Sequence, residues 1–250
     1  MPYMGIAGGV WDKIRDAMVA WGLELKDSFV QNFIAENRWK YLVNGLGVTL
    51  QVTFFAVIIG IVLGFLVAIV RSTADKTGKL GFLNGICRVY LTVIRGTPVV
   101  VQLLIIYFVI FSSVDIDKVV AAVVAFGLNS GAYVAEIVRS GIMSIDQGQF
   151  EAGRSLGFNY GQTMWHIIVP QAFKNVLPAL ANEFIVLLKE TSVCGYIALQ
   201  DLTKGGDIIR SRTYDPFLPL IAVAVIYLVI VMGLSALVTR LVRWLRSSDP

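Results

Sequence analysis

The segment Glu151-Ala152-Gly153-Arg154-Ser155-Leu156-Gly157, followed ten residues later by Ile167-Ile168-Val169-Pro170, is a polar stretch in a chain that is otherwise mostly apolar. The residues before Gly157 suit a short helix. Gly157 suits the left-handed position just after a helix C-terminus, because glycine has no Cβ. Asn159 to Gln162 continue the turn and start a second short helix, and Pro170 adjusts the entry into the next apolar segment. The pattern predicts two short helices outside a membrane, joined by a turn.

The composition indicates a helical membrane protein with several spans. Of the 250 residues 56% are hydrophobic and only 15% are charged, and the charges cluster between long apolar runs. This distribution is typical of membrane-spanning helices separated by polar loops. The net charge of +4 reflects basic loops, so we expect membrane lipid and no nucleic acid as a partner. With His166 as the single histidine and two distant cysteines, Cys87 and Cys194, we expect no metal site and no disulfide.

Five apolar segments approach or exceed the roughly 20 residues that a helix needs to cross a bilayer. Gly60 and Gly64, in the first of them, have the spacing that lets two helices approach closely. The predicted spans are 42–70, 89–111, 119–140, 165–188 and 216–239.

The first 40 residues differ from the rest of the chain. Apolar residues recur at three- and four-residue spacing, and charged residues fill the other face, which predicts an amphipathic helix in the membrane interface or packed on the spans. The apolar positions are Trp11, Ile14, Met18, Trp21 and Leu25. We therefore divide the chain into an amphipathic segment, 1–40, and a transmembrane domain, 41–246, with the polar loop at about 145–164.

Basic residues orient the chain, because cytoplasmic loops are enriched in lysine and arginine. The segment from Arg71 to Arg88 and the tail with Arg240, Arg243 and Arg246 are basic. Five spans then place the N-terminus outside, and the 145–164 loop and the C-terminus in the cytoplasm.

The motif E-A-x-x-x-x-G with the delayed I-x-V-P resembles the signature loop of permease subunits in bacterial ABC importers. Four further segments are similar to the group of these permeases that carries polar amino acids, and the resemblance covers about residues 42 to 246. These segments are Asn44 to Leu50, Tyr90 to Gln102, Asn129 to Arg139, and Lys189 to Ser192. Gly153 stands where a second alanine is common in this family, and Val169 where a leucine is common.

The resemblance implies an all-α membrane protein with five core transmembrane helices of the type I importer fold, preceded by an amphipathic helix. It implies an inner-membrane permease for polar amino acids whose loop contacts a separate ATPase. The expected coupling residues are Glu151, Ala152, Gly153, Ser155 and Gly157. Further expected partners are a second permease, identical or paralogous, and an extracytoplasmic amino-acid-binding protein.

We expect no enzymatic activity and no bound cofactor in this chain. Gly78-Lys79 lacks the preceding glycine and the following hydroxyl residue of a phosphate-binding loop. ATP and magnesium would therefore be used by the partner subunit.

Ionisable residues inside spans are costly, so they line polar cavities or pair with each other. Arg95 and Glu136 are the leading candidates for the substrate path, because a zwitterionic amino acid needs both a cationic and an anionic partner. Thr97, Asn129 and Ser130 could add neutral hydrogen bonds. The alternative is structural: Glu136 pairs with Arg139, three residues along the same helix, or with Arg95.

Two other classes of function compete with the importer. An ion-gradient-driven carrier would need inverted repeats and paired broken helices, and neither is visible in the sequence. A channel or scaffold would leave the 145–164 loop unexplained. The sequence leaves open which amino acid is carried.

Overall fold

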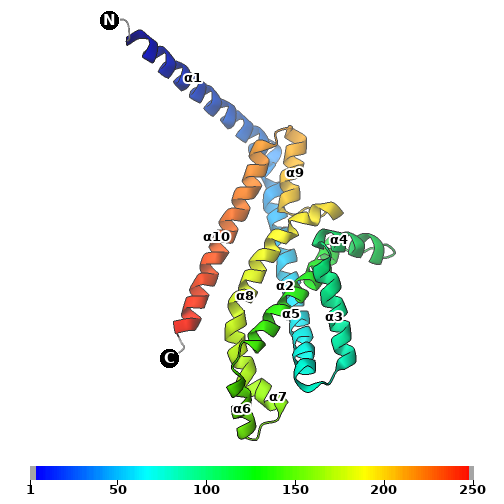
Figure 1. The fold of residues 1–250 in the computed structure, drawn as a ribbon. Coiled ribbons are helices and arrows are strands. Elements are labelled where there is room, and N and C mark those ends of the chain that lie inside the picture. The colour runs from blue at the N-terminus through cyan, green and yellow to red at the C-terminus, as the bar shows by residue number, and fades with distance from the viewer. Residues whose placement is uncertain (1–3, 248–250) are drawn as a thin grey trace.

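A computed structural model describes residues 4–247, with side chains for residues 11–243, and this part of the chain is helical without strands. Residues 1–3 of the predicted amphipathic segment and the side chain of Arg246 lie outside the described part. Figure 1 shows long helices bundled side by side, with α1 extending away from them. The helices are α1 (Met4–Phe29), α2 (Trp39–Thr77), α3 (Gly81–Gly96), α4 (Val99–Ile105), α5 (Lys118–Met143), α6 (Gln147–Ser155), α7 (Tyr160–Thr163), α8 (Val169–Glu190), α9 (Leu202–Thr213) and α10 (Phe217–Ser247).

Helices α2 and α5 pack closely at the centre of the bundle. A Cβ on Gly60 would lie 2.8 Å from the Ser130 hydroxyl oxygen, and a Cβ on Gly64 would lie 2.5 Å from a Val134 methyl. Neither glycine could carry a side chain without moving α5. The small-residue spacing in the sequence therefore marks a real helix contact.

The described residues contain three helices that are long and apolar enough to cross a membrane: α2, α5 and the Phe217–Arg243 part of α10. A fourth span results if α3 and the segment from Val99 to Ile110 count as one bent unit. Helix α8, the predicted span 165–188, is not among them; its first half carries Gln171, Lys174 and Asn175. The count of five spans stays a prediction.

The predicted span 89–111 is not a single straight helix, because the chain bends by 109° between α3 and α4. Thr97 is extended, the conformation that a following proline imposes, and Pro98 has no N–H to continue the helix. The Gln102 side-chain amide donates to the carbonyls of Ile94 at 2.7 Å and Thr97 at 3.0 Å. It thereby satisfies acceptors that the bend has freed.

The start of α8 also differs from the prediction. Residues Met164–Ile168 form a π-helical turn, and α8 begins at Val169 with Pro170 in its first turn. The π-helical turn changes the hydrogen-bond register just before Pro170, which has no N–H to donate.

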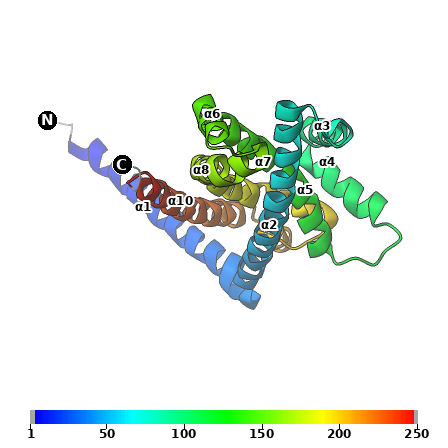
Figure 2. The same cartoon turned by 90° about the horizontal axis from the view of Figure 1, so that it is seen from below.

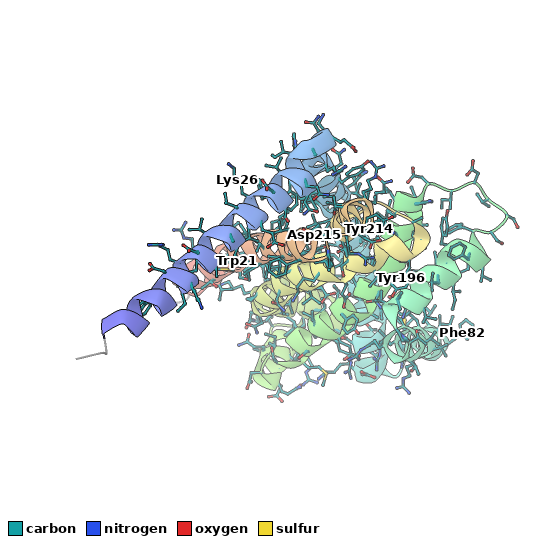
Figure 3. All side chains as sticks on the ribbon, turned by 90° about the horizontal axis from the view of Figure 1, so that it is seen from above. Trp21, Lys26, Phe82, Tyr196, Tyr214 and Asp215 are labelled. Carbon is teal, nitrogen blue, oxygen red and sulfur yellow. The ribbon has the colours of Figure 1, made fainter. Side chains whose placement is uncertain are left out.

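Helix α1 lies apart from the bundle in Figures 1 and 2. Trp11 and Trp21 are 70% and 62% exposed, so the expectation that this helix packs on the spans is wrong for the side chains that the structure describes. Its place in the membrane interface stays a prediction. Just beyond α1, the buried Asn32 donates to a carboxylate oxygen of Asp215 at 2.6 Å. Figure 3 shows Asp215 beside Tyr214, at the connection between α9 and α10.

The two ends of the bundle are distinct in Figure 1. Helices α6 and α7 lie at the same end as the α2–α3 connection, and α10 runs toward that end. Helix α9 and the junction of α1 with α2 lie at the other end. The two basic segments and the polar loop therefore share one end, as the orientation argument requires.

Candidate functional site

The polar loop is built from two capped helices. Asp146 starts α6 by accepting a hydrogen bond from the backbone N–H of Gly148 at 2.6 Å. After α6 the N–H groups of Gly157 and Phe158 donate to the carbonyls of Arg154 and Gly153, at 2.9 and 3.0 Å. Gly157 has φ of +80°. This is the Schellman arrangement, and it confirms the left-handed position expected for Gly157.

Helix α7 begins with a reciprocal cap. The Asn159 side chain accepts from the Gln162 N–H at 3.0 Å, and the Gln162 side chain accepts from the Asn159 N–H at 2.9 Å. Such a capping box fixes the direction of a short helix. Hydrogen bonds between neighbouring residues thus fix the turn where it leaves α6 and where it enters α7.

The predicted coupling residues divide into two groups. Glu151, Ala152 and Ser155 are exposed on α6, whereas Gly153 is buried against Thr163 of α7. Gly153 therefore acts inside the loop, holding α6 against α7, and the exposed surface is formed by the other residues.

The loop is anchored to the bundle by apolar packing and by one lysine. Ile145 and Phe150 pack with the cluster that includes Val138 and Ile168. The Lys76 ammonium of α2 donates to Gln147 at 3.1 Å and lies 4.8 Å from the centre of the Phe150 ring. The role of Lys76 was not predictable from the sequence, because its partners lie about 70 residues further along the chain.

A second contact joins α2 and α5 just above the loop. Arg139 donates to Asp75 at 3.0 Å. These residues line a cavity of about 220 Å³ together with Lys76 and Tyr160. Burial raises the pKa of the Tyr160 phenol. The predicted pairing of Arg139 with Glu136 is wrong, because the Arg139 guanidinium pairs with Asp75 on α2 instead.

Glu136 and Arg95 come together as the sequence suggested, and a third residue joins them. One carboxylate oxygen of Glu136 lies 3.2 Å from Arg71 and 3.6 Å from Arg95. The Arg95 guanidinium also lies 5.7 Å from the centre of the Tyr133 ring. Together with Arg88, these residues line a cavity of about 590 Å³ between α2, α3 and α5.

The three neutral candidates lie in two separate networks. Asn129 donates to the Gln102 side-chain oxygen at 3.1 Å, and the Gln102 amide donates to the Thr97 hydroxyl at 2.9 Å. Ser130 instead donates to Glu183 of α8 at 3.0 Å. Asn129 and Ser130 are almost fully buried. Gln102 was missed, although an amide inside an apolar helix is itself a signal.

Within the described residues, no group of three or more His, Cys, Asp or Glu side chains could hold a metal ion. Cys194 is buried and Cys87 is partly buried, and both are free thiols.

A family of transport proteins has this architecture. The family model "Binding-protein-dependent transport system inner membrane component" matches residues 60–247. The chain belongs to this family. It is a membrane-spanning permease subunit of an ABC importer.

Curated relatives cover most of the chain. The arginine transport system permease protein ArtQ of Bacillus subtilis is 39% identical over 211 residues, 84% of this chain and 94% of the relative. The putative glutamine transport system permease protein GlnP of Rickettsia typhi is 40% identical over 197 residues, 78% of this chain and 88% of the relative.

Solved structures agree with the fold. A chain from the crystal structure of an amino acid ABC transporter with histidines is 41% identical, with a TM-score of 0.75; the match covers 84% of this chain and 97% of that chain. A chain of the inward-facing MetNI methionine ABC transporter has a TM-score of 0.72 at 21% identity, over 83% of this chain and 97% of that chain, and supports the fold alone.

Proposed function

We propose that this chain is the permease subunit of an ABC importer that moves polar amino acids across the cytoplasmic membrane into the cell. Its relatives named for arginine and glutamine transport support the substrate class. The family supports an ATPase and a binding protein as partners. ATP and magnesium are then used by the ATPase subunit, and this chain has no enzymatic activity of its own.

The α6–α7 loop is the contact for the ATPase. The observation that carries this proposal is the exposed face of Glu151, Ala152 and Ser155 on a helix capped at both ends. Only residues 144–146 separate α6 from α5, and α7 is joined to α8 by one π-helical turn. A movement of the loop would therefore be transmitted directly to α5 and α8.

The substrate path runs along α3 and α5. Support comes from the cavity that contains Arg95 and Glu136, because ionisable side chains in a membrane protein gather around water-filled cavities. Thr97, at the end of α3, and Asn129 and Ser130, on α5, would add neutral hydrogen-bonding groups to this path. A second permease, a copy of this chain or a paralogue, closes the path from the other side.

The basic segments and the α6–α7 loop, at one end of the bundle, face the cytoplasm. The N-terminus lies outside, and α9, at the end of the bundle opposite the loop, would meet the binding protein. This orientation rests on the positive-inside rule and on the shared end of the two basic segments.

ATP-dependent uptake of labelled amino acids into liposomes tests the proposal. The liposomes carry this chain, its ATPase and its binding protein, and the variant Glu151→Ala is compared with wild type. We expect uptake that requires ATP and falls at least tenfold in Glu151→Ala, because the variant removes a polar contact to the ATPase.

Glu24→Ala is the matched control, since Glu24 is exposed on α1, far from the loop. It should transport like wild type. Uptake that proceeds without ATP and ignores Glu151→Ala would instead identify an ion-gradient-driven carrier or a channel.

A further inference from the structure

An apolar cavity lies beside the α6–α7 loop, separate from the charged cavity between α2, α3 and α5. Its volume is about 480 Å³, and its walls come from α2, α5, α7, the π-helical turn after α7, and α8. None of the side chains on its walls is charged, and only Thr73 and Tyr160 carry a hydroxyl group. The largest apolar side chains on the walls are Phe65, Ile69, Ile142, Met164, Trp165 and Phe173. The volume lies in the range of ligand pockets, so the cavity can hold a sizeable apolar group.

Several of these wall residues are exposed on the surface of the bundle. Ile69 is 51% exposed, Phe173 is 47% exposed and Trp165 is 71% exposed. Helices α2 and α5, which form two of the walls, are long and apolar enough to cross a membrane. Tryptophan is enriched where a membrane protein passes from the acyl chains to the headgroups. This arrangement places the cavity at the depth where one membrane leaflet meets water.

Two smaller cavities with polar walls adjoin the apolar one. Tyr160 lines all three cavities, and Lys76 lines the two polar ones, whose volumes are about 220 and 250 Å³. Arg154 lies on the wall of the larger polar cavity. Asp75, the single acidic residue on the walls of the two polar cavities, is already paired with Arg139 at 3.0 Å. The charges of Lys76 and Arg154 are therefore in excess, and they attract an anionic group to this side of Tyr160.

Two buried donors in the smaller polar cavity lack an acceptor. Ser72 is only 5% exposed, and its Oγ atom has no hydrogen-bond partner among the described residues. The Nε atom of Arg139, on the same cavity, is buried without a partner in the described part of the chain as well. Buried polar groups in proteins are nearly always hydrogen-bonded. Both atoms therefore call for an acceptor from outside the chain, and the oxygens of a phosphate group are strong acceptors.

The three cavities together fit a ligand with an apolar chain and an anionic head. A free anion would leave the apolar cavity unfilled, and a plain hydrocarbon would leave Ser72 and Arg139 unpaired. Basic pockets between membrane helices bind the headgroups of anionic lipids. We propose that these cavities bind one anionic phospholipid from the leaflet at the α6–α7 end of the bundle. An acyl chain fills the apolar cavity, and the phosphate lies on the side of Tyr160 where Lys76 and Arg154 supply positive charge. The bound lipid joins α7 and α8 to α2 and α5.

Retention of lipid through purification tests the site. The permease–ATPase complex is incubated in detergent with equal amounts of dioleoyl phosphatidylglycerol and dioleoyl phosphatidylcholine, and the lipid that it retains is counted by native mass spectrometry. We expect wild type to retain phosphatidylglycerol about tenfold or more over phosphatidylcholine, because the two lipids have the same chains and differ in charge. Lys76→Gln combined with Arg154→Gln should remove this preference. Val169→Trp, at a residue on the wall of the apolar cavity, should reduce retention of phosphatidylglycerol about tenfold or more.

Two controls separate recognition from surface charge and from damage to the fold. Lys79→Gln combined with Arg240→Gln removes two positive charges from exposed residues that line none of the three cavities, so this variant should retain lipid like wild type. Phosphatidylglycerol added to the lipid-free complex should raise the melting temperature of wild type but not that of Val169→Trp. Lys76 and Arg154 are both exposed, so their double variant should fold even if Val169→Trp does not.

The proposal is overturned if wild type retains the two lipids equally, or if the double variant and its control lose the preference to the same extent. Displacement of phosphatidylglycerol by inorganic phosphate alone would also overturn it, because the site would then hold a free anion. If no lipid is retained and Val169→Trp instead prevents two permeases from pairing, the apolar cavity is covered by a second copy of this chain. None of these measurements involves transport, so their failure would leave the importer function standing.

Discussion

Gly153 of α6 and Thr163 of α7 are packed so closely that a Cβ on Gly153 would lie 2.6 Å from both the Cγ2 and the Oγ1 atom of Thr163. Threonine is branched at Cβ and turns little about χ1, so it cannot move aside easily. This contact fixes the angle between the two short helices of the loop. It also explains why a glycine at position 153 suits this loop better than an alanine.

Gly153→Ala should therefore weaken coupling, although alanine is the better helix former by about 1 kcal/mol. Overpacking costs about 1–3 kcal/mol, so the steric effect should win and shift α6 away from α7. We expect less ATP-dependent uptake and weaker retention of the ATPase subunit on purification.

The double variant Gly153→Ala with Thr163→Ala should recover most of the lost uptake, because it removes both clashing atoms. Thr163→Ala alone also removes a buried hydroxyl without a hydrogen-bond partner, so its own effect should be small. No recovery in the double variant would mean that the Gly153–Thr163 contact does not set the loop geometry.

Lys76→Ala should lower the amount of amino acid transported per ATP hydrolysed. The substitution removes the hydrogen bond to Gln147 and the contact with the Phe150 ring, which join α2 to α6. Both contacts are exposed, so the cost in stability should stay below about 1 kcal/mol while the loop loses its link to α2. Uptake and ATP hydrolysis are measured on the same liposomes.

Lys79→Ala is the matched control, because Lys79 is an exposed lysine of the α2–α3 connection whose side chain forms no ion pair among the described residues. Equal transport per ATP in both variants would show that Lys76 does not transmit movement.

Local signals made the loop predictable. The glycine at the end of α6 and the Asn159–Gln162 pair at the start of α7 lie within six residues of one another, and each acts on its own backbone.

The bend between α3 and α4 was missed because the local signal there is weak. The apolar run continues through Pro98, so composition indicated one span, and only Thr97-Pro98 marked the break.

The charged cavity was predictable only in part. Arg95 and Glu136 stand out because each interrupts an apolar helix. Arg71 lies 65 residues before Glu136, so no periodicity links the two, and the orientation of neighbouring helices decides which charges meet. The orientation of α2 against α5 likewise explains why Arg139 pairs with Asp75 rather than with Glu136 on its own helix.

Asp207→Asn should reduce stability at neutral pH and have no effect in strong acid. The side chains of Lys204 and Arg210, which donate hydrogen bonds to Asp207 on α9, hold its pKa below the ordinary value of 3.8. A depressed pKa means that the folded state prefers the ionised carboxylate. Its contribution is thus present above about pH 3.8 and is lost as the pH falls through the lower folded-state pKa.

Thermal unfolding of the purified permease between pH 7 and about pH 2 measures this effect. Wild type should melt above Asp207→Asn at pH 7, and the two curves should converge toward the acid end. Glu24→Gln on α1 controls for the loss of one negative charge. A difference that persists unchanged below the folded-state pKa would contradict the role of the ionised carboxylate.

Gly45→Ala and Gly47→Ala should have opposite effects, although both lie near the start of α2. A Cβ on Gly45 would lie 2.5 Å from the carbonyl oxygen of Asp201, whereas a Cβ on Gly47 would meet nothing within 4 Å. A backbone atom cannot turn aside as a side chain does, so Gly45→Ala must push the start of α9 away from α2. We expect a loss of about 1–3 kcal/mol for Gly45→Ala and a gain of up to about 1 kcal/mol for Gly47→Ala. Unfolding of the two variants in the same detergent measures both changes in stability. Equal stabilisation by the two substitutions would show that α9 can move away from α2 at no cost.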